Sequence, residues 1–553
     1  MAVFKDRKSV TDSSGPPTEE PHKMTTPFAR EATGIVRSFS SMDTFMLTTF
    51  GISYGVSLAL TLVAVPSILP GANIGVSVIA ALPFVLGLGL LYTWFTESMP
   101  RSGGDYVWIS RAIHPVVAIA ISGVWVFFQG TFVGAATSFI YGSILGPGLG
   151  TLGILTGNSW LINAGSALGS STYILILGLL TILLTLVVLI LPLRVFLRLQ
   201  LGAWVIGMIS VVLFFVIFAT SSHAQFISTY NSYFSQYNST YSGVISSAAS
   251  GGFSNPGVIL FGGATGLAVV YAIFAVNGYQ FGGYVGGEIR GPRKGMYYSA
   301  IIGALLIVVV LAAGGYLVQN VLGGDFLNSI EYLIGTGSYS VPFSFNAYFV
   351  AILLNGNVVV GALLVIGLFA WAILPYFVAG ILLSRVMMAW GFDRAAPSAL
   401  SHVNNRFHVP DVGVIVYVIL ATLGLLLSLY YGFFFANVNF ILVIVLLSIF
   451  VGIAGIVFPY TRKDLFRLSP VSKHTIGGIP MLSLLGVFVT FSFSVFAYYL
   501  IQYPQLSGPT GPTAFELLGG ALIVAILMYL ITRAYYKSKG LAVDLVFKEI
   551  PPE

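Results

Sequence analysis

The stretch Asn277-Gly-Tyr-Gln-Phe-Gly-Gly283 interrupts an apolar block that spans residues 259–286. A similar stretch, Gly51-Ile-Ser-Tyr-Gly55, lies in the first apolar block of the chain, residues 44–69. Glycine tolerates backbone conformations that end a helix. Interrupted helices at corresponding positions of two chain halves are typical of membrane proteins built from inverted repeats. Close helix packing by small residues is the alternative for each glycine taken alone.

The composition around these two stretches is that of an integral membrane protein. Hydrophobic residues make up 57% of the 553 residues and charged residues 8%, against about a quarter charged in soluble domains. A soluble globular protein is therefore excluded. Because about 20 apolar residues cross a bilayer as a helix, we predict an all-α protein with twelve crossings: 44–69, 76–98, 113–144, 172–192, 198–220, 259–286, 297–319, 358–390, 411–430, 434–458, 479–502 and 513–535.

The 24 Lys and Arg residues fall into seven short clusters between these segments. They are Lys5 to Arg37, Arg101 and Arg111, Arg194 and Arg198, Arg290 to Lys294, Arg385 to Arg406, Arg462 to Lys473, and Arg533 to Lys548. Loops on the cytoplasmic side retain Lys and Arg. A chain that crosses twice between successive clusters places all seven on one side, so both termini are predicted to be cytoplasmic in a plasma membrane protein.

The predicted organisation follows from comparing segments 1–5 with segments 6–10, which match in position as a five-plus-five inverted repeat. The outer connection 320–357 is predicted to hold one or two short helices. The predicted parts are a largely disordered cytoplasmic tail (1–40), a first repeat (41–220), an extracellular loop (221–258), a second repeat (259–458), two further helices with their preceding cytoplasmic loop (459–535) and a cytoplasmic C-terminal tail (536–553).

Other classes of function lack residues to support them. The net charge of +6 comes from cations at membrane edges, which indicates lipid headgroups rather than nucleic acid as the partner. There is no cysteine, and the six histidines have no metal-ligand spacing. We therefore expect no metal, no cofactor and no enzymatic machinery.

Charge within the membrane is sparse. Asp43, Glu97 and Glu288 lie near the predicted inner ends of segments. We expect each to pair with a nearby arginine, as Glu288 could with Arg290 or Arg293; the alternative for Glu288 is a cytoplasmic gate. A charged solute would then be held by the free N–H and C=O groups at the ends of interrupted helices, which suit a zwitterion.

Four landmarks resemble motifs of the amino acid–polyamine–organocation (APC) superfamily. Glu97-Ser-Met-Pro-Arg-Ser-Gly-Gly-Asp-Tyr-Val107 resembles the signature after the second helix, and Ser110-Arg-Ala-Ile-His-Pro115 resembles a variant of prokaryotic, often archaeal, members. Phe274-Ala-Val-Asn-Gly-Tyr-Gln280, followed by Glu288-Ile-Arg-Gly-Pro292, is similar to the sixth-helix motif. The other two landmarks are Ser384-Arg-Val-Met-Met-Ala-Trp-Gly-Phe-Asp-Arg-Ala-Ala-Pro397 and Pro459-Tyr-Thr-Arg-Lys-Asp-Leu-Phe466 with Gly478-Ile-Pro480.

The resemblance implies an amino acid permease with the LeuT-like fold, in which helices 1 and 6 are discontinuous and two additional helices follow the repeats. It implies that Ser53, Tyr54 and Gly55 border the substrate carboxylate. The implied border of the substrate amine is formed by Phe274, which would also act as a gate, and by Ala275, Val276, Asn277 and Gly278. Inner charges at the landmarks outline a predicted cytoplasmic gate: Glu97, Arg101, Glu288, Arg290, Arg385 and Asp393.

Three departures from the family pattern concern the site. The Gly-x-Gly of helix 1 is present only as Gly51-Ile-Ser-Tyr-Gly55, the usual acidic residue of helix 6 is Gln280, and helix 5 has no lysine between Leu199 and Gln225. Coupling to H+, coupling to Na+ and exchange all stay open. The leading hypothesis is secondary active transport of amino acids across the plasma membrane by alternating access, either of neutral amino acids or with weak selectivity among amino acids. Polyamine, organocation or other small nitrogenous solute transport and amino acid exchange are the alternatives, ahead of a channel or a sensor.

Overall fold

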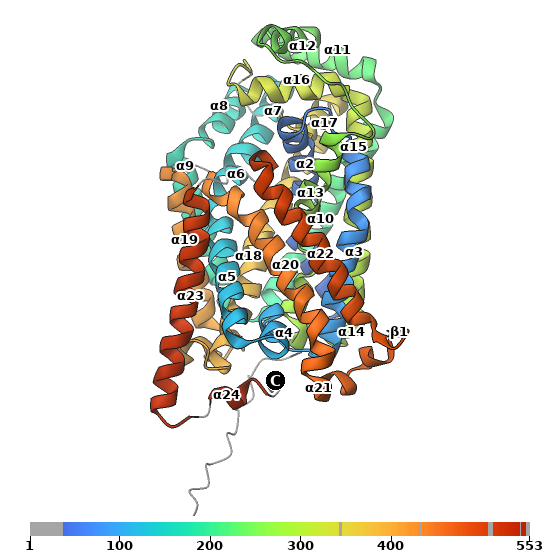
Figure 1. Ribbon diagram of the computed structural model, residues 1–553. Coiled ribbons are helices and arrows are strands. Elements are labelled where there is room, and N and C mark those ends of the chain that lie inside the picture. Colours follow the sequence, from blue (N-terminus) through green and yellow to red (C-terminus); the bar gives the residue numbers. More distant parts are fainter. Residues whose placement is uncertain (1–36, 342–344, 432–433, 507–511, 542, 549–553) are drawn as a thin grey trace, which may run out of the picture.

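The computed structural model describes residues 37–341, 345–431, 434–506, 512–541 and 543–548 (Figure 1). Within them the regular secondary structure is helical apart from an antiparallel pair of two-residue strands, β1 (Thr475–Ile476) and β2 (Ile479–Pro480). Most of the predicted N-terminal tail and the last residues of the C-terminal tail lie outside the described residues.

Eleven helical segments in the described part of the chain are long and apolar enough to cross a membrane. They are α1 with α2 (Ser41–Ile52, Tyr54–Ile68), α3 (Ile74–Ser98), α5 to α7 (Pro115–Thr156), α9 (Ser171–Ile190), α10 (Leu193–Thr220), α14 to α15 (Pro292–Leu322), α18 (Val358–Phe392), α19 (Asp411–Tyr431), α20 (Phe434–Thr461), α22 (Met481–Gln502) and α23 (Pro512–Ser538). The predicted all-helical membrane protein is thus confirmed.

The predicted crossing 259–286 is not one continuous helix. Its α-helix, α13 (Gly263–Ala275), has 13 residues, and two 3-10 turns follow it, η3 (Phe281–Tyr284) and η4 (Gly286–Glu288). The change comes at Gly278, whose φ of 120° no α-helix contains. Within the described residues, the predicted crossing 259–286 is therefore not among the eleven segments that are long and apolar enough to span a membrane.

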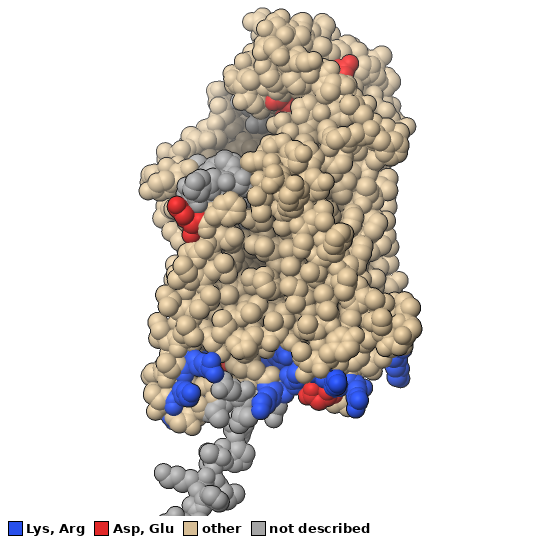
Figure 2. Space-filling view, in the orientation of Figure 1, with Lys and Arg blue, Asp and Glu red and all other residues tan. Residues whose placement is uncertain are grey.

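The described Lys and Arg residues gather at one end of the molecule, which we call the basic end. Figure 2 shows the Lys and Arg side chains of the visible face gathered there. Contacts between distant segments bring the clusters together: the backbone of Phe39 bridges to Ile289, and that of Ser102 bridges to Val285. The Gln200 amide donates to the Asp43 carbonyl at 3.0 Å, which places the start of α10 at the same end.

Four short helices cover the opposite end (Figure 1): α11 (His223–Phe234), α12 (Tyr241–Ser250), α16 (Gly324–Gly335) and α17 (Ala347–Asn355). The last two confirm the short helices predicted within 320–357. Tyr332 ties two of these segments together, because its hydroxyl donates to the Gly251 carbonyl at 2.6 Å.

Two glycines let α5 (Pro115–Ala135) and α19 approach each other closely. A Cβ atom on Gly134 would overlap the Ala421 carbonyl oxygen, and one on Gly424 would overlap the Thr131 carbonyl oxygen. In each case the obstacle is backbone, which cannot rotate away as a side chain can. Small residues at such crossings are the usual means of packing membrane helices.

We expect Gly424→Ala to lower the thermal unfolding midpoint of the detergent-purified protein, because overpacking typically costs about 1–3 kcal/mol. Gly520→Ala is the matched control, since Gly520 is also helical and a Cβ there would meet nothing within 4 Å. Scanning fluorimetry of both variants measures the effect. Equal midpoints for the two variants would contradict the packing argument.

Candidate functional site

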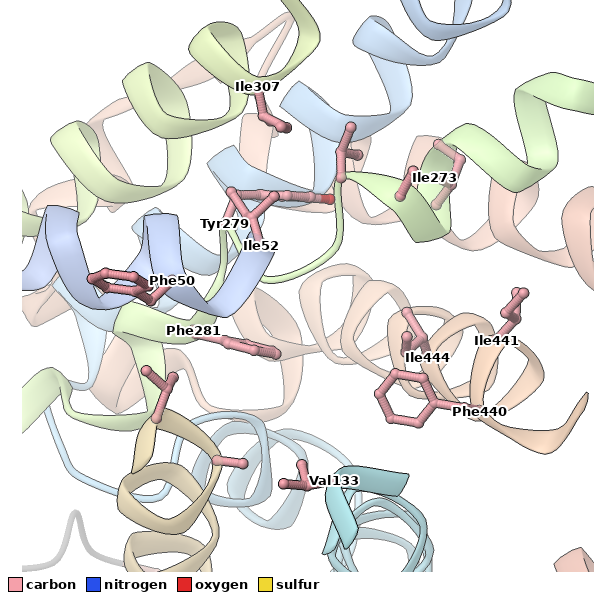
Figure 3. Close-up of a cluster of buried hydrophobic side chains, with 14 of the residues drawn as sticks. Phe50, Ile52, Val133, Ile273, Tyr279, Phe281, Ile307, Phe440, Ile441 and Ile444 are labelled. Atoms are coloured by element: carbon pink, nitrogen blue, oxygen red, sulfur yellow. The ribbon is translucent and has the colours of Figure 1, made fainter. Parts of the chain in front are cut away.

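A cavity of about 370 Å³ lies between α1, α2, α5, α13, α18 and α20. Its lining follows α2 from Ser53 to Ile68 and reaches Gln505 and Leu506, so the cavity extends from the middle of the bundle away from the basic end. Apolar side chains form most of its wall. Three of these side chains, Val133, Phe281 and Phe440, are labelled in the cluster of buried apolar side chains in Figure 3.

The first helical segment is interrupted at Ser53, which lines the cavity. This residue has φ 59° and ψ 69°, between the end of α1 and the start of α2. A residue other than glycine seldom adopts this conformation, and here a long-range contact holds it. The Ser53 hydroxyl donates to the Trp371 carbonyl of α18 at 2.6 Å.

The end of α13 is held by local hydrogen bonds of side-chain amides. The Gln280 amide nitrogen donates to the Asn277 side-chain oxygen at 2.8 Å, and the Gln280 side-chain oxygen accepts from the Gly278 N–H at 3.1 Å. The residue that replaces the family's acidic side chain therefore closes the turn after the helix, without placing a charge beside the cavity.

The two interruptions touch each other. A Cβ atom on Gly278 would lie 2.5 Å from the carbonyl carbon of Gly51. Glycine at this position therefore serves both the backbone conformation and the contact with α1.

Four of the predicted substrate residues, Ser53, Phe274, Ala275 and Asn277, line the cavity. The other four have structural surroundings instead. The Tyr54 hydroxyl donates to the Gly303 carbonyl at 2.7 Å, and its ring stacks on Trp371 with ring centroids 5.6 Å apart. A Cβ atom on Gly55 would lie 2.5 Å from the same indole. Val276 is fully buried, and Gly278 contacts Gly51.

Several lining residues were missed by the sequence reasoning, among them Gln129, Phe132, Tyr376 and Phe440. The aromatic residues carry no signal, because apolar side chains are expected throughout a membrane helix. Gln129 does carry one, as a polar residue within an apolar segment. Its side-chain oxygen is buried and has no hydrogen-bond partner among the described residues.

Two buried ion pairs join distant helices at the basic end. Arg385 of α18 forms two hydrogen bonds with Glu288 of η4, at 2.9 and 3.0 Å. Arg111 of α4 (Asp105–Ala112) donates to Asp393, just after α18, at 2.8 Å. The expected pairing of Glu288 with Arg290 or Arg293 is therefore wrong: Glu288 points into the protein and its partner lies 97 residues away.

The remaining predicted gate residues lie nearer the surface. Glu97 is 3.7 Å from Arg293, whose side chain is 76% exposed. Arg290 donates to the Arg37 carbonyl at 3.0 Å, and Arg101 donates to the Pro100 carbonyl at 2.9 Å. The predicted group thus divides into buried residues (Glu288, Arg385, Asp393) and residues at the rim. Arg111 was noted only as a cation and was missed as a partner of Asp393.

A bundle of membrane-spanning helices around an internal cavity is typical of solute transporters. Comparison with known families places it within that class: a family model described as amino acid permease matches residues 45–530. The chain belongs to the amino acid permease family, within the APC superfamily, and its function is amino acid transport across a membrane. It is a transporter, not an enzyme. No curated protein matches the sequence.

We expect Arg385→Met to destabilise the protein strongly, because removing one partner of a buried ion pair typically costs about 3–5 kcal/mol. The double variant Arg385→Met, Glu288→Met removes both charges and should recover much of the lost melting temperature. Arg293→Met is the control, because its pairing with Glu97 is exposed and weak. A double variant less stable than Arg385→Met alone would contradict the interpretation.

Proposed function

We propose that this permease is a secondary active transporter that moves neutral amino acids by alternating access. The observation that carries the proposal is the cavity, whose wall includes residues of both interruptions, Ser53 and Asn277. The proposed fold is the LeuT-like one: a five-plus-five inverted repeat (41–220 and 259–458), with helices 1 and 6 discontinuous at Ser53 and Gly278 and two helices added after the repeats.

The helix ends at the cavity supply the two poles that a zwitterion requires. The N-terminus of α2 carries partial positive charge and the C-terminus of α13 partial negative charge. The substrate carboxylate therefore lies beside Ser53, with Tyr54 and Gly55 behind it, and the ammonium lies beside Ala275 and Asn277. The unpartnered side-chain oxygen of Gln129 is a second acceptor for that ammonium.

The cavity wall favours an apolar substrate side chain. None of the described lining residues is Asp, Glu, Lys, Arg or His, so a second charge on the substrate would be buried without a partner, which is costly. A volume of about 370 Å³ falls in the range of small-molecule sites, about 300–1,000 Å³. Phe274 and Phe440, whose ring centroids are 6.1 Å apart, supply aromatic surface for such a side chain.

The basic end is the proposed cytoplasmic side, since positive charge is retained there. In this proposal the protein lies in the plasma membrane. Both termini are cytoplasmic, and residues 221–258 are extracellular. The pairs Glu288–Arg385 and Arg111–Asp393 form the closed cytoplasmic gate, with Glu97, Arg101 and Arg290 at its rim. Opening toward the cytoplasm requires these contacts to separate.

Transport of polyamines or organocations is the weaker alternative. A cationic solute is recognised by carboxylates, and the described lining has none. The same cavity would suit exchange of one neutral amino acid for another.

The test of substrate class is uptake by the purified full-length protein in liposomes. Radiolabelled leucine is the probe, with unlabelled amino acids, polyamines and nucleobases as competitors, under imposed H+ or Na+ gradients. We expect apolar neutral amino acids to compete most strongly and lysine, glutamate and putrescine to compete weakly. Competition by polyamines or nucleobases alone would overturn the proposal.

We expect Gly278→Ala to lower uptake at least tenfold per amount of monodisperse protein, because the added Cβ meets the Gly51 backbone and the φ of 120° disfavours alanine. Gly266→Ala is the matched control within α13, where a Cβ would meet nothing within 4 Å. Undiminished uptake by Gly278→Ala would argue against a substrate site at this interruption.

A further inference from the structure

We propose that the carboxyl group of Asp105 is a proton-binding site that controls the gate at the basic end, with the bound proton favouring the closed gate. The inference deepens the proposed function, since it assumes that this end opens during transport. Asp105 is the first residue of α4 and is fully buried. Neither ion pair of the gate uses it.

The carboxyl group links three elements of the closed gate. Its Oδ2 accepts hydrogen bonds from the hydroxyls of Tyr284 in η3, at 2.5 Å, and Tyr92 in α3, at 3.1 Å. Its Oδ1 is buried and has no hydrogen-bond partner among the described residues. An oxygen that is left without a donor in a buried carboxyl is the natural place for a proton, because burial penalises the charged form.

The loop before Asp105 is docked on the same turn that supplies Tyr284. The Gly103 N–H donates to the Tyr284 carbonyl at 2.9 Å, and a Cβ on Gly104 would lie 2.9 Å from the Tyr284 ring. Separation of η3 from this loop therefore breaks the Tyr284 hydroxyl bond and lets water reach the carboxyl group.

The charged groups around Asp105 leave it without a cation. On α4 and α18, Arg111 is paired with Asp393 and Arg385 with Glu288. On η4, Glu288 also accepts from the Ser102 hydroxyl at 3.5 Å. The titratable side chains that contact the Asp105 carboxyl are Tyr92 and Tyr284.

The direction of the coupling follows from the two states of the gate. Burial raises the pKa of the Asp105 carboxyl from 3.8 to about 6, against the opposing effect of the two tyrosine hydroxyls and of the backbone N–H groups of Tyr106 and Asp105. In an open gate the carboxyl is hydrated and has its ordinary pKa. The proton thus binds more tightly to the closed gate and stabilises it, and this stabilisation is lost as pH rises through 6. Because the pKa values of the closed and open states differ by about two units, pH can change the open-to-closed ratio by at most about a hundredfold.

The absence of cysteine from the chain provides a direct measurement of gate opening. Thr96 of α3 is fully buried, and its side chain lies against Gly283 and Gly286, so Thr96→Cys places a single thiol behind the closed gate. Its labelling rate with a membrane-impermeant sulfonated maleimide is measured in nanodiscs between pH 5 and 7.5. Ser538→Cys, an exposed site on α23, corrects for the pH dependence of the thiol itself.

The corrected labelling rate of Thr96→Cys should rise by about tenfold from pH 5 to pH 7.5, because the closed gate loses its bound proton over this range. Adding Asp105→Asn, which resembles the protonated form, should leave the rate low at all pH values. Adding Tyr284→Phe removes a hydroxyl that stabilises the carboxylate and should move the midpoint to higher pH. Asp464→Asn, at an exposed carboxylate of the same end, should change nothing.

A pH profile of Thr96→Cys that is flat, or that persists unchanged in both the Asp105→Asn and Tyr284→Phe backgrounds, would overturn the proposal. Tyr284→Phe keeps the test decisive if Asp105→Asn does not fold. The labelling needs no substrate. A negative labelling result is therefore distinguishable from a negative uptake result, because the uptake experiment tests the cavity alone.

Discussion

The contact between Gly278 and Gly51 is the constraint on which the rest of the structure depends. It brings the end of α13 against the end of α1, where a side chain on Gly278 would meet backbone. Because both helices stop at this contact, the end of α1, the start of α2 and the end of α13 lie together inside the bundle. The cavity forms there, and its polarity comes from backbone ends and a few amides, with no ionisable residue among its described lining.

Two kinds of contact hold the helices around that cavity together. Toward the basic end, the buried pairs Glu288–Arg385 and Arg111–Asp393 join η4, α4 and α18. A buried ion pair gains little over apolar packing, which makes it suited to a contact that forms and breaks. Elsewhere, as where Gly134 meets α19, backbone packs on backbone. Such contacts have no second arrangement, so they suit the rigid parts of a transporter.

Sequence reasoning succeeded for features that depend on neighbouring residues and failed for contacts between residues far apart in the chain. Spans and short outer helices are determined by local hydropathy and were predicted well, and the glycine stretches indicated where helices stop. Partners were predicted poorly. Glu288 was assigned to neighbouring arginines, whereas its actual partner is Arg385. Tyr54 and Gly55 belong to the motif of the site, yet they face Trp371 and not the cavity.

The sequence by itself determined the membrane class, the positions of the spans and the family, because hydropathy, charge clusters and short motifs are read along the chain. Only the tertiary structure decided which residues face the cavity, which carboxylates are paired and that Asp105 is buried between two tyrosines. The physical reason is that burial and pairing depend on segments far apart in the chain. The sequence around a carboxyl group does not show whether an arginine or a tyrosine will contact it in the folded protein.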